Sequence, residues 1–152
     1  IGYFGPNNLF LLTIYILLRN HKYNVKLMFL FLIIICWLLF SVFLVEQLKK
    51  IIKQPRPNQK KYLNNMDKKH GQQYGMPSGH AQLVSNIGTF IILYFQNFYI
   101  NIVVLTQIFI TCWQRWYFKM HTIPQLLVGC LIGSFLGYGL YKIVYKYKKK
   151  KS

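Results

Sequence analysis

Three groups of polar residues stand in a fixed order among the apolar runs of this sequence. They are Lys49 with Arg56-Pro57, then Pro77-Ser78-Gly79-His80, and finally Arg115, His121 and Gln125. Lysine and arginine supply charged hydrogen-bond donors for phosphoryl oxygens, and one arginine can bind two oxygens at once. Two histidines can supply a nucleophile and a proton donor and acceptor. The set therefore predicts phosphoryl transfer, with Lys49, Arg56 and Arg115 as substrate-binding residues.

The remaining residues of the set complete this predicted mechanism. His121 is the predicted nucleophile, and His80 is the predicted acid and base for the leaving oxygen and for water. Ser78 and the Gly79 N–H add donors before a helix expected to begin near His80, where the positive end of the helix dipole favours an anion. Gln125 is expected to accept a hydrogen bond from Nδ1 of His121, provided that the turn between them is helical.

The composition excludes several other kinds of chemistry. The chain has 19 Lys and Arg against two acidic residues, Glu46 and Asp67, and a formal net charge of +17. Paired-carboxylate catalysis and oxygen-ligand metal sites need more carboxylates than these. The three cysteines form no CxxC pair, so we predict no metal and no cofactor. Nucleic acid is not the expected partner, because the long apolar runs leave no soluble surface to read it.

Five apolar runs must position these residues. They are expected at about Asn8–Leu18, Leu27–Val45, Ala81–Phe95, Phe98–Trp113 and Thr122–Tyr145, with a polar loop from Glu46 to His80. About 18 or more apolar residues are needed to cross a bilayer core of ~30 Å. We therefore predict an all-α, polytopic transmembrane helix bundle. The whole chain, 1–152, would be one membrane domain, with residues 49–125 as its functional core.

The order of the runs also predicts that the polar groups meet. The loop after the second run and the loop after the fourth are separated by two crossings, so they face the same side of the membrane. Basic residues are divided almost evenly between the two sides, so charge bias alone does not orient the chain. We favour a cytosolic carboxyl-terminal tail, because the basic residues of the long loop are expected to bind substrate.

The three groups together resemble the signature of the type 2 phosphatidic-acid-phosphatase superfamily. Their spacing is Lys-x6-Arg-Pro, Pro-Ser-Gly-His and Arg-x5-His, over about half of the chain. This resemblance implies metal-independent hydrolysis through a phosphohistidine on His121. The local sequence around the motifs, such as Tyr74-Gly75-Met76 before the second group, looks like that of the dolichyl-diphosphate phosphatase branch. Most of the superfamily has Asp where this chain has Gln125, whereas that branch tolerates Gln.

The resemblance implies a polyprenyl diphosphate substrate, dolichyl diphosphate in particular, converted to the monophosphate so that the carrier lipid can be reused in protein glycosylation. A broader phosphatase of phosphatidate-like lipids remains an alternative. A catalytically inactive phospholipid-binding membrane protein is another. Lys149 and Lys150 are fourth and third from the end and resemble a dilysine retrieval signal. They predict an endoplasmic-reticulum membrane protein with a lumenal active site and a cytosolic tail.

Overall fold

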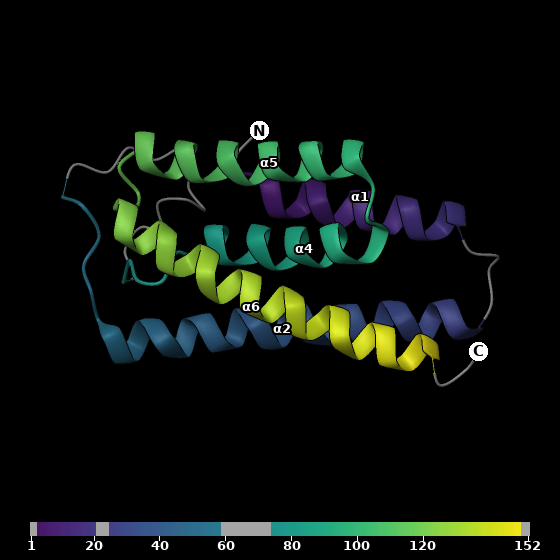
Figure 1. Ribbon diagram of the computed structural model, residues 1–152. Helices are drawn as coiled ribbons and strands as arrows, with labels where there is room; N and C mark the ends of the chain where they lie inside the picture. Colours follow the sequence, from purple (N-terminus) through teal and green to yellow (C-terminus); the bar gives the residue numbers. More distant parts are fainter. Residues whose placement is uncertain (1–2, 21–24, 59–73, 150–152) are drawn as a thin grey trace.

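The chain folds as a bundle of helices. The computed structural model describes residues 3–20, 25–58 and 74–149, and within them five helices form. They are α1 (Gly5–Asn20), α2 (Val25–Ile52), α4 (Gly79–Phe95), α5 (Phe98–Tyr117) and α6 (Ile123–Lys149). Figure 1 shows α1, α2, α4 and α5 with roughly parallel axes and alternating chain direction, and α6 crossing them obliquely. The prediction of an all-α bundle is confirmed.

Helix α4 is the centre of the bundle and packs against all four of the other helices described. Its most extensive contact is with α6, where glycines allow the two backbones to approach closely. A Cβ atom at Gly129 would lie 2.7 Å from the Ser78 carbonyl oxygen, and one at Gly133 would overlap the Gln82 carbonyl oxygen. A larger residue at either position would push the helices apart, because packed interiors do not absorb an added methyl group freely.

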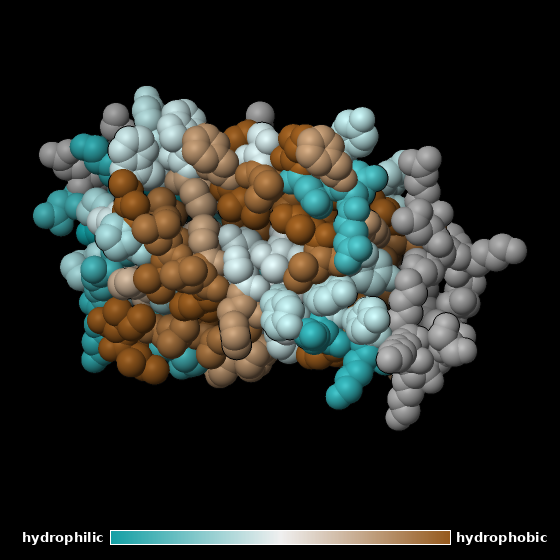
Figure 2. Space-filling view, viewed as in Figure 1, coloured by the Kyte–Doolittle hydropathy of each residue, from teal (hydrophilic) through white to brown (hydrophobic). Residues whose placement is uncertain are grey.

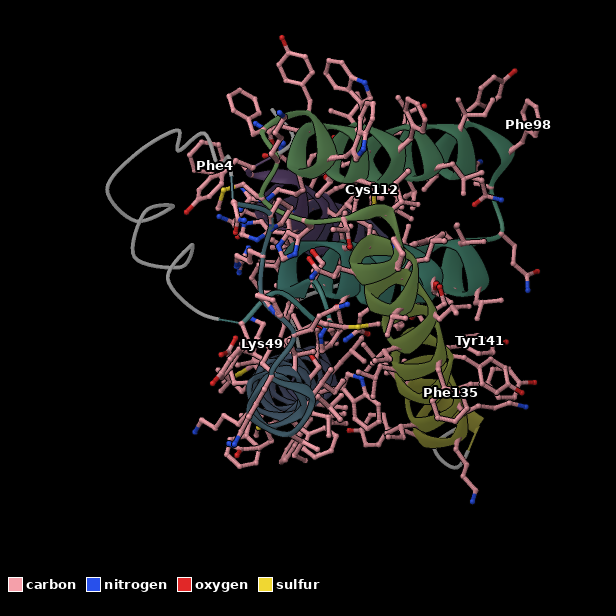
Figure 3. All side chains as sticks on the ribbon, turned by 90° about the vertical axis from the view of Figure 1, so that its left-hand side faces the viewer. Phe4, Lys49, Phe98, Cys112, Phe135 and Tyr141 are labelled. Carbon is pink, nitrogen blue, oxygen red and sulfur yellow. The ribbon has the colours of Figure 1, made fainter. Side chains whose placement is uncertain are left out.

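Large hydrophobic side chains cover much of the outside of the bundle. Phe98 and Phe135 are 71% and 78% exposed, and Figure 3 shows both pointing away from the helices. In Figure 2 hydrophobic side chains cover a broad area of one face, with hydrophilic side chains at its left-hand end and again toward the right. Two spans, Met28–Ile52 and Ile123–Tyr147, are long and apolar enough to cross a membrane, and α1 contains a shorter apolar stretch. A surface of this kind suits lipid.

Helix α2 is longer than the sequence predicted. Glu46 was expected to begin a loop, yet the helix continues to Ile52 and carries Glu46 and Lys49 in its last two turns. Lys53 then adopts a left-handed conformation, with φ of 52°, and its N–H donates to the Lys49 carbonyl at 2.9 Å. Charge marks the end of the apolar run but does not break helical hydrogen bonding, which ends here at a left-handed cap before two prolines.

Several sequence-based expectations lie outside the described residues. These concern the middle of the polar loop, residues 59–73, which includes Asp67, and the end of the basic tail at 150–152. The proposed dilysine signal and the side of the membrane on which it lies therefore stay predictions.

Candidate active site

The loop after α2, the segment before α4 and the loop between α5 and α6 meet at one end of the bundle. The Ser78 N–H donates to the Gln125 carbonyl at 3.1 Å, and the Gly75 N–H donates to the Gln54 carbonyl at 2.8 Å. Arg56 reaches across with Nη1 3.0 Å from the Met120 carbonyl oxygen. The prediction that the polar loops face the same side is confirmed, and backbone groups hold them together.

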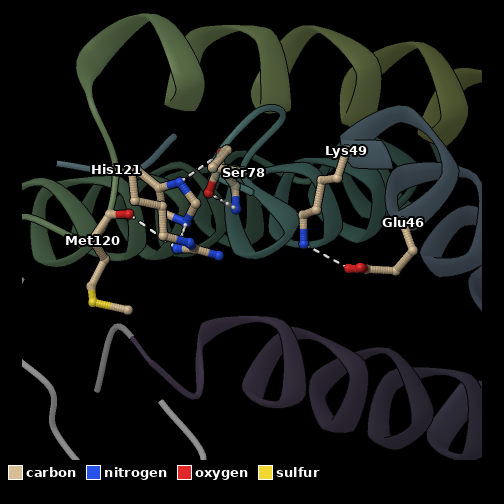
Figure 4. Close-up of polar contacts among 8 residues, drawn as sticks. Glu46, Lys49, Ser78, Met120 and His121 are labelled. Atoms are coloured by element: carbon tan, nitrogen blue, oxygen red, sulfur yellow. Dashed lines mark hydrogen bonds and ion pairs between the residues drawn. The ribbon is translucent and has the colours of Figure 1, made fainter. Parts of the chain in front are cut away.

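His121 has a defined tautomer because of its two neighbours. Its Nδ1 lies 3.0 Å from the Gly75 carbonyl oxygen, and its Nε2 lies 2.8 Å from Nη1 of Arg56 (Figure 4). A carbonyl oxygen only accepts and a guanidinium only donates, so the proton is on Nδ1 and the lone pair is on Nε2. The imidazole is therefore held neutral, with a nucleophilic nitrogen beside Arg56.

The surroundings of His121 keep this ring unprotonated. The side chain is almost fully buried, and burial is the main reason that its pKa lies well below the ordinary value of 6.5. The positive charges of Arg56 and Arg115, and then His80, lower the pKa further. The hydrogen bond to the Gly75 carbonyl opposes these effects but is weaker than they are. The ring is thus available as a base or a nucleophile at neutral pH.

A polar pocket of about 290 Å³ opens beside His121. The side chains or backbone of six predicted site residues line it: Lys49, Arg56, Gly79, His80, Arg115 and His121. Lys49 reaches it from the last turn of α2, and Arg115 from the last turn of α5. Three cations in one pocket attract a multiply charged anion. The sequence-predicted cations and both histidines therefore converge. Figure 4 shows Lys49 and His121 of this set.

Lys49 has an acidic neighbour in this pocket. Its Nζ lies 2.6 Å from Oε1 of Glu46, one turn earlier on α2. The Lys49 side chain is 7% exposed and that of Glu46 is 40% exposed. An ammonium group has three donors, and one bond to Glu46 leaves two for other acceptors. Glu46 therefore orients the lysine without occupying all its hydrogen-bonding capacity.

Ser78 lies beside the pocket, outside the set of residues that line it. It is fully buried and is the N-cap of α4, with its Oγ 3.5 Å from the Ala81 N–H. Gly79 and His80 follow as the first helical residues and do line the pocket. The helix begins one residue earlier than expected. The positive end of its dipole faces the polar pocket and favours an anion there.

Gln125 does not make the hydrogen bond that the sequence predicted. Its Oε1 accepts from the Thr122 N–H at 3.2 Å, and its Nε2 donates to Pro55 and Gln54 oxygens at 2.9 and 3.1 Å. The expected donor, Nδ1 of His121, is bonded to the Gly75 carbonyl instead. The reason is that α6 begins only at Ile123, so the turn from His121 is not helical. Gln125 ties the two loops together.

Gly75 and Tyr3 also belong to this site and were missed by sequence reasoning. Gly75 supplies the carbonyl for His121, and a Cβ there would lie 2.7 Å from the Gln125 amide atoms. Tyr3 lines the pocket, with its ring centroid 5.1 Å from that of His80 and 5.5 Å from the Arg115 guanidinium carbon. A backbone carbonyl has no side-chain signature, and Tyr3 lies far from the motifs in sequence.

Comparison with known proteins places the chain in a wider context. A model of the PAP2 superfamily matches residues 30–149. The chain is 26% identical over 140 residues to lipid A 4'-phosphatase of Bacteroides thetaiotaomicron, covering 88% of this chain and 61% of that protein. It thus spans about three fifths of that relative's length.

A solved structure is also similar. It is described as the first transmembrane PAP2 type phosphatidylglycerolphosphate phosphatase from Bacillus subtilis. The TM-score is 0.69 at 17% identity, over 95% of this chain and 73% of that chain. At this identity the likeness concerns the fold, which is that of a multi-pass transmembrane bundle.

Proposed function

Because the chain belongs to the PAP2 superfamily, we propose that it is an integral membrane phosphatase of lipid phosphates that works through a phosphohistidine. The observation that carries this proposal is the neutral imidazole of His121, whose Nε2 lone pair lies beside Arg56 in a pocket with three cations. Phosphoryl transfer depends mainly on positioning and on stabilisation of negative charge. The pocket supplies both.

In the first proposed step, Nε2 of His121 attacks phosphorus and the bond from phosphorus to the leaving oxygen breaks. Arg56 moves its hydrogen bond from Nε2 to a phosphoryl oxygen while it keeps the Met120 carbonyl, 3.0 Å from Nη1. Lys49 and Arg115 offset the charge on the other oxygens. His80, which lines the pocket, gives a proton to the leaving oxygen. The Gly75 carbonyl keeps the proton on Nδ1 and stabilises the ring as it becomes positive.

In the second proposed step, water hydrolyses the phosphohistidine. His80 is now neutral, so it can take a proton from water as the oxygen attacks phosphorus. The bond between phosphorus and Nε2 breaks, and the neutral His121 ring is restored with inorganic phosphate as the product. His80 is protonated again for the next cycle. Each histidine therefore ends in the state in which it began.

An apolar groove beside the pocket supports a lipid as the substrate. This groove, a cavity of about 220 Å³, lies between α1, α2 and α4 and includes Phe10, Ile35, Leu38 and Ile87. Pro6, Asn7, Val42 and Leu83 line both the groove and the polar pocket. A molecule with a charged end and a hydrocarbon chain fits this arrangement, because its charged end can lie in the polar pocket and its hydrocarbon chain in the apolar groove.

Which lipid is hydrolysed is a finer question. The names of the two relatives refer to lipid A and to phosphatidylglycerolphosphate, and they favour the broader class of lipid phosphates over dolichyl diphosphate. We therefore propose the broader class first and keep dolichyl diphosphate, suggested by residues 74–82, as a second candidate. Neither relative supports an endoplasmic-reticulum location or a role in glycosylation, and both remain predictions from the sequence.

The test is release of inorganic phosphate by purified protein in detergent with EDTA. Phosphatidate and dolichyl diphosphate would be compared for wild type, His121→Ala and the matched change His70→Ala, which removes a histidine outside the signature. We expect wild type and His70→Ala to release phosphate and His121→Ala to release none. Faster hydrolysis of phosphatidate supports the broader class, and faster hydrolysis of dolichyl diphosphate supports the second candidate.

The phosphohistidine itself can be trapped. His80→Ala should accumulate phosphoenzyme from a ³²P-labelled aryl phosphate, whose leaving group needs no acid, because loss of the base slows hydrolysis. The label should survive alkaline quenching and be absent from the double variant with His121→Ala. No phosphate release by folded wild-type protein from either lipid would refute the proposal and favour an inactive lipid-binding protein.

A further inference from the structure

Gln82 is a buried donor that the proposed mechanism does not use. It is 1% exposed, lies one turn after Gly79 on α4, and lines the polar pocket. Within the described part of the chain its Nε2 has no hydrogen-bond partner. A buried amide group without a partner costs stability, and Gln82, unlike the equally buried Asn86, lies where a ligand could supply that partner. Because Gln82 lines the pocket, a ligand there can lie close to this side chain and offer the acceptor that its Nε2 lacks.

The position of Gln82 defines which part of a ligand it would meet. The next residue, Leu83, lines both the polar pocket and the apolar groove. Gly79 and His80, three and two residues before Gln82, line the polar pocket and not the groove. On α4, Gln82 therefore lies where the cationic surface gives way to the apolar one. A substrate with its phosphorus at His121 and its hydrocarbon in the groove has its linkage region near Gln82.

We propose that Gln82 is a specificity-determining residue that donates from Nε2 to an oxygen of the substrate just beyond the leaving oxygen. This inference rests on the proposed function. The acceptor is an ester or hydroxyl oxygen in a glycerol-based lipid, or an oxygen of the second phosphate in a diphosphate. A plain alkyl or prenyl monophosphate has no oxygen there. A site built to bond an oxygen discriminates against a substrate that lacks it, because its own donor stays unpaired.

Two pairs of lipids with equal chains distinguish the two sources of the acceptor. The first pair is 1-oleoyl lysophosphatidate and oleyl phosphate, and the second is farnesyl diphosphate and farnesyl phosphate. Phosphate release would be measured in detergent for wild type and for Gln82→Met, which keeps the length but removes the donor. Asn86→Leu is the matched control. Asn86, one turn after Gln82 on α4, is also a fully buried amide without a partner in the described residues. It does not line the polar pocket.

We expect Gln82→Met to lower kcat/KM about tenfold for the member of a pair that carries the acceptor, and to leave its partner within about twofold. Loss in the first pair identifies a glycerol-type oxygen, and loss in the second identifies the diphosphate. Asn86→Leu should leave both ratios unchanged. Equal losses on all four lipids, or no loss on any, would overturn the role of Gln82.

Wild-type protein provides a second measurement if Gln82→Met fails to fold. Hydrolysis of the plain phosphates as fast as their oxygen-bearing partners would overturn the inference, and a preference of tenfold or so for a partner supports it. Failure of the proposed function has a different signature, since wild type would then release phosphate from none of the four lipids.

Discussion

Replacing Gln125 with aspartate separates two accounts of this site. The sequence resemblance suggests that a carboxylate here would strengthen His121, because most of the superfamily has Asp at this position. The structure predicts the opposite. Nδ1 of His121 is bonded to the Gly75 carbonyl, and Gln125 uses Nε2 as a donor to Pro55 and Gln54. Aspartate has no donor, and its side chain is one methylene shorter.

The size of the effect follows from the hydrogen bonds that Gln125→Asp removes. The two donations from Nε2 are lost, and the shorter side chain withdraws from the Thr122 N–H. A hydrogen bond contributes about 0.5–1.5 kcal/mol net. Since Pro55 is exposed and Gln54 is half-buried, we take a loss of about 2 kcal/mol in the free energy of unfolding for the three bonds. For a chain of this length, that loss lowers the Tm by about 4–8 °C.

The activity should fall as well, because Gln125 holds the loop that carries Arg56. Small displacements of a positioning group can reduce a rate by ten- to a hundredfold or so. Thermal unfolding in detergent and phosphate release would be measured for wild type, Gln125→Asp, Gln125→Glu and Gln96→Asp. Gln125→Glu keeps the length but loses the donor. Gln96→Asp makes the same chemical change at an exposed left-handed residue, φ 48°, where aspartate is tolerated.

The reasoning would be refuted if Gln125→Asp kept the wild-type Tm and raised kcat. That result would mean that position 125 acts on His121 through charge, as the resemblance suggests. A fall in Tm and in kcat for both Gln125 variants, with Gln96→Asp unchanged, supports the role of Gln125 in joining the loops.

Two further predictions concern protonation and helix packing. In ¹⁵N-histidine NMR spectra, assigned with a His121→Asn variant, His121 should keep a protonated Nδ1 and a bare Nε2 well below pH 6.5, because its pKa is lowered by burial first and then by nearby positive charge. Between pH 6.5 and that lowered pKa only the unfolded state gains the proton. The free energy of unfolding should therefore decrease as the pH is lowered, and more in wild type than in the variant. Titration of His121 near pH 6.5 would contradict this. Gly133→Ala should destabilise the bundle by about 1–3 kcal/mol, because the new Cβ overlaps the Gln82 carbonyl oxygen. Gly139→Ala, whose Cβ would lie 3.1 Å from the Trp37 ring, should cost less because a side chain can move, and equal Tm values for the two would count against the close helix contact.

Much of this site is predictable because its chemistry resides in side chains at short, ordered spacings. Lys49, Arg56, His80, Arg115 and His121 were all identified from residue type and order, and all line one pocket. Their convergence also followed from the sequence, since an even number of crossings returns the chain to the same side. The side on which a loop lies depends only on the number of apolar runs before it and is independent of where each helix ends.

Helix boundaries were less predictable than the number of helices. The apolar run of α2 stops at Val45, yet the helix ends at Ile52, so Lys49 is held on a rigid helix. Hydropathy reports the environment of side chains, whereas a helix ends where its backbone hydrogen bonds do. The same distinction explains Gln125, because its spacing from His121 suggested contact only if the intervening turn were helical.

Residue types and their order along the chain were sufficient to predict the helix bundle, the three cationic residues of the site and its two histidines. Only the tertiary structure decided which groups touch. The Gly75 carbonyl that selects the tautomer of His121 and the Tyr3 ring against His80 both depend on segments distant in sequence. So does the Gln82 Nε2, which has no partner among the described residues. A backbone carbonyl looks the same at every residue, and an amide gives no sign in sequence of whether it has a partner. Hydrogen-bond partners are chosen by distance and direction at the scale of an ångström, and those are set when the helices pack.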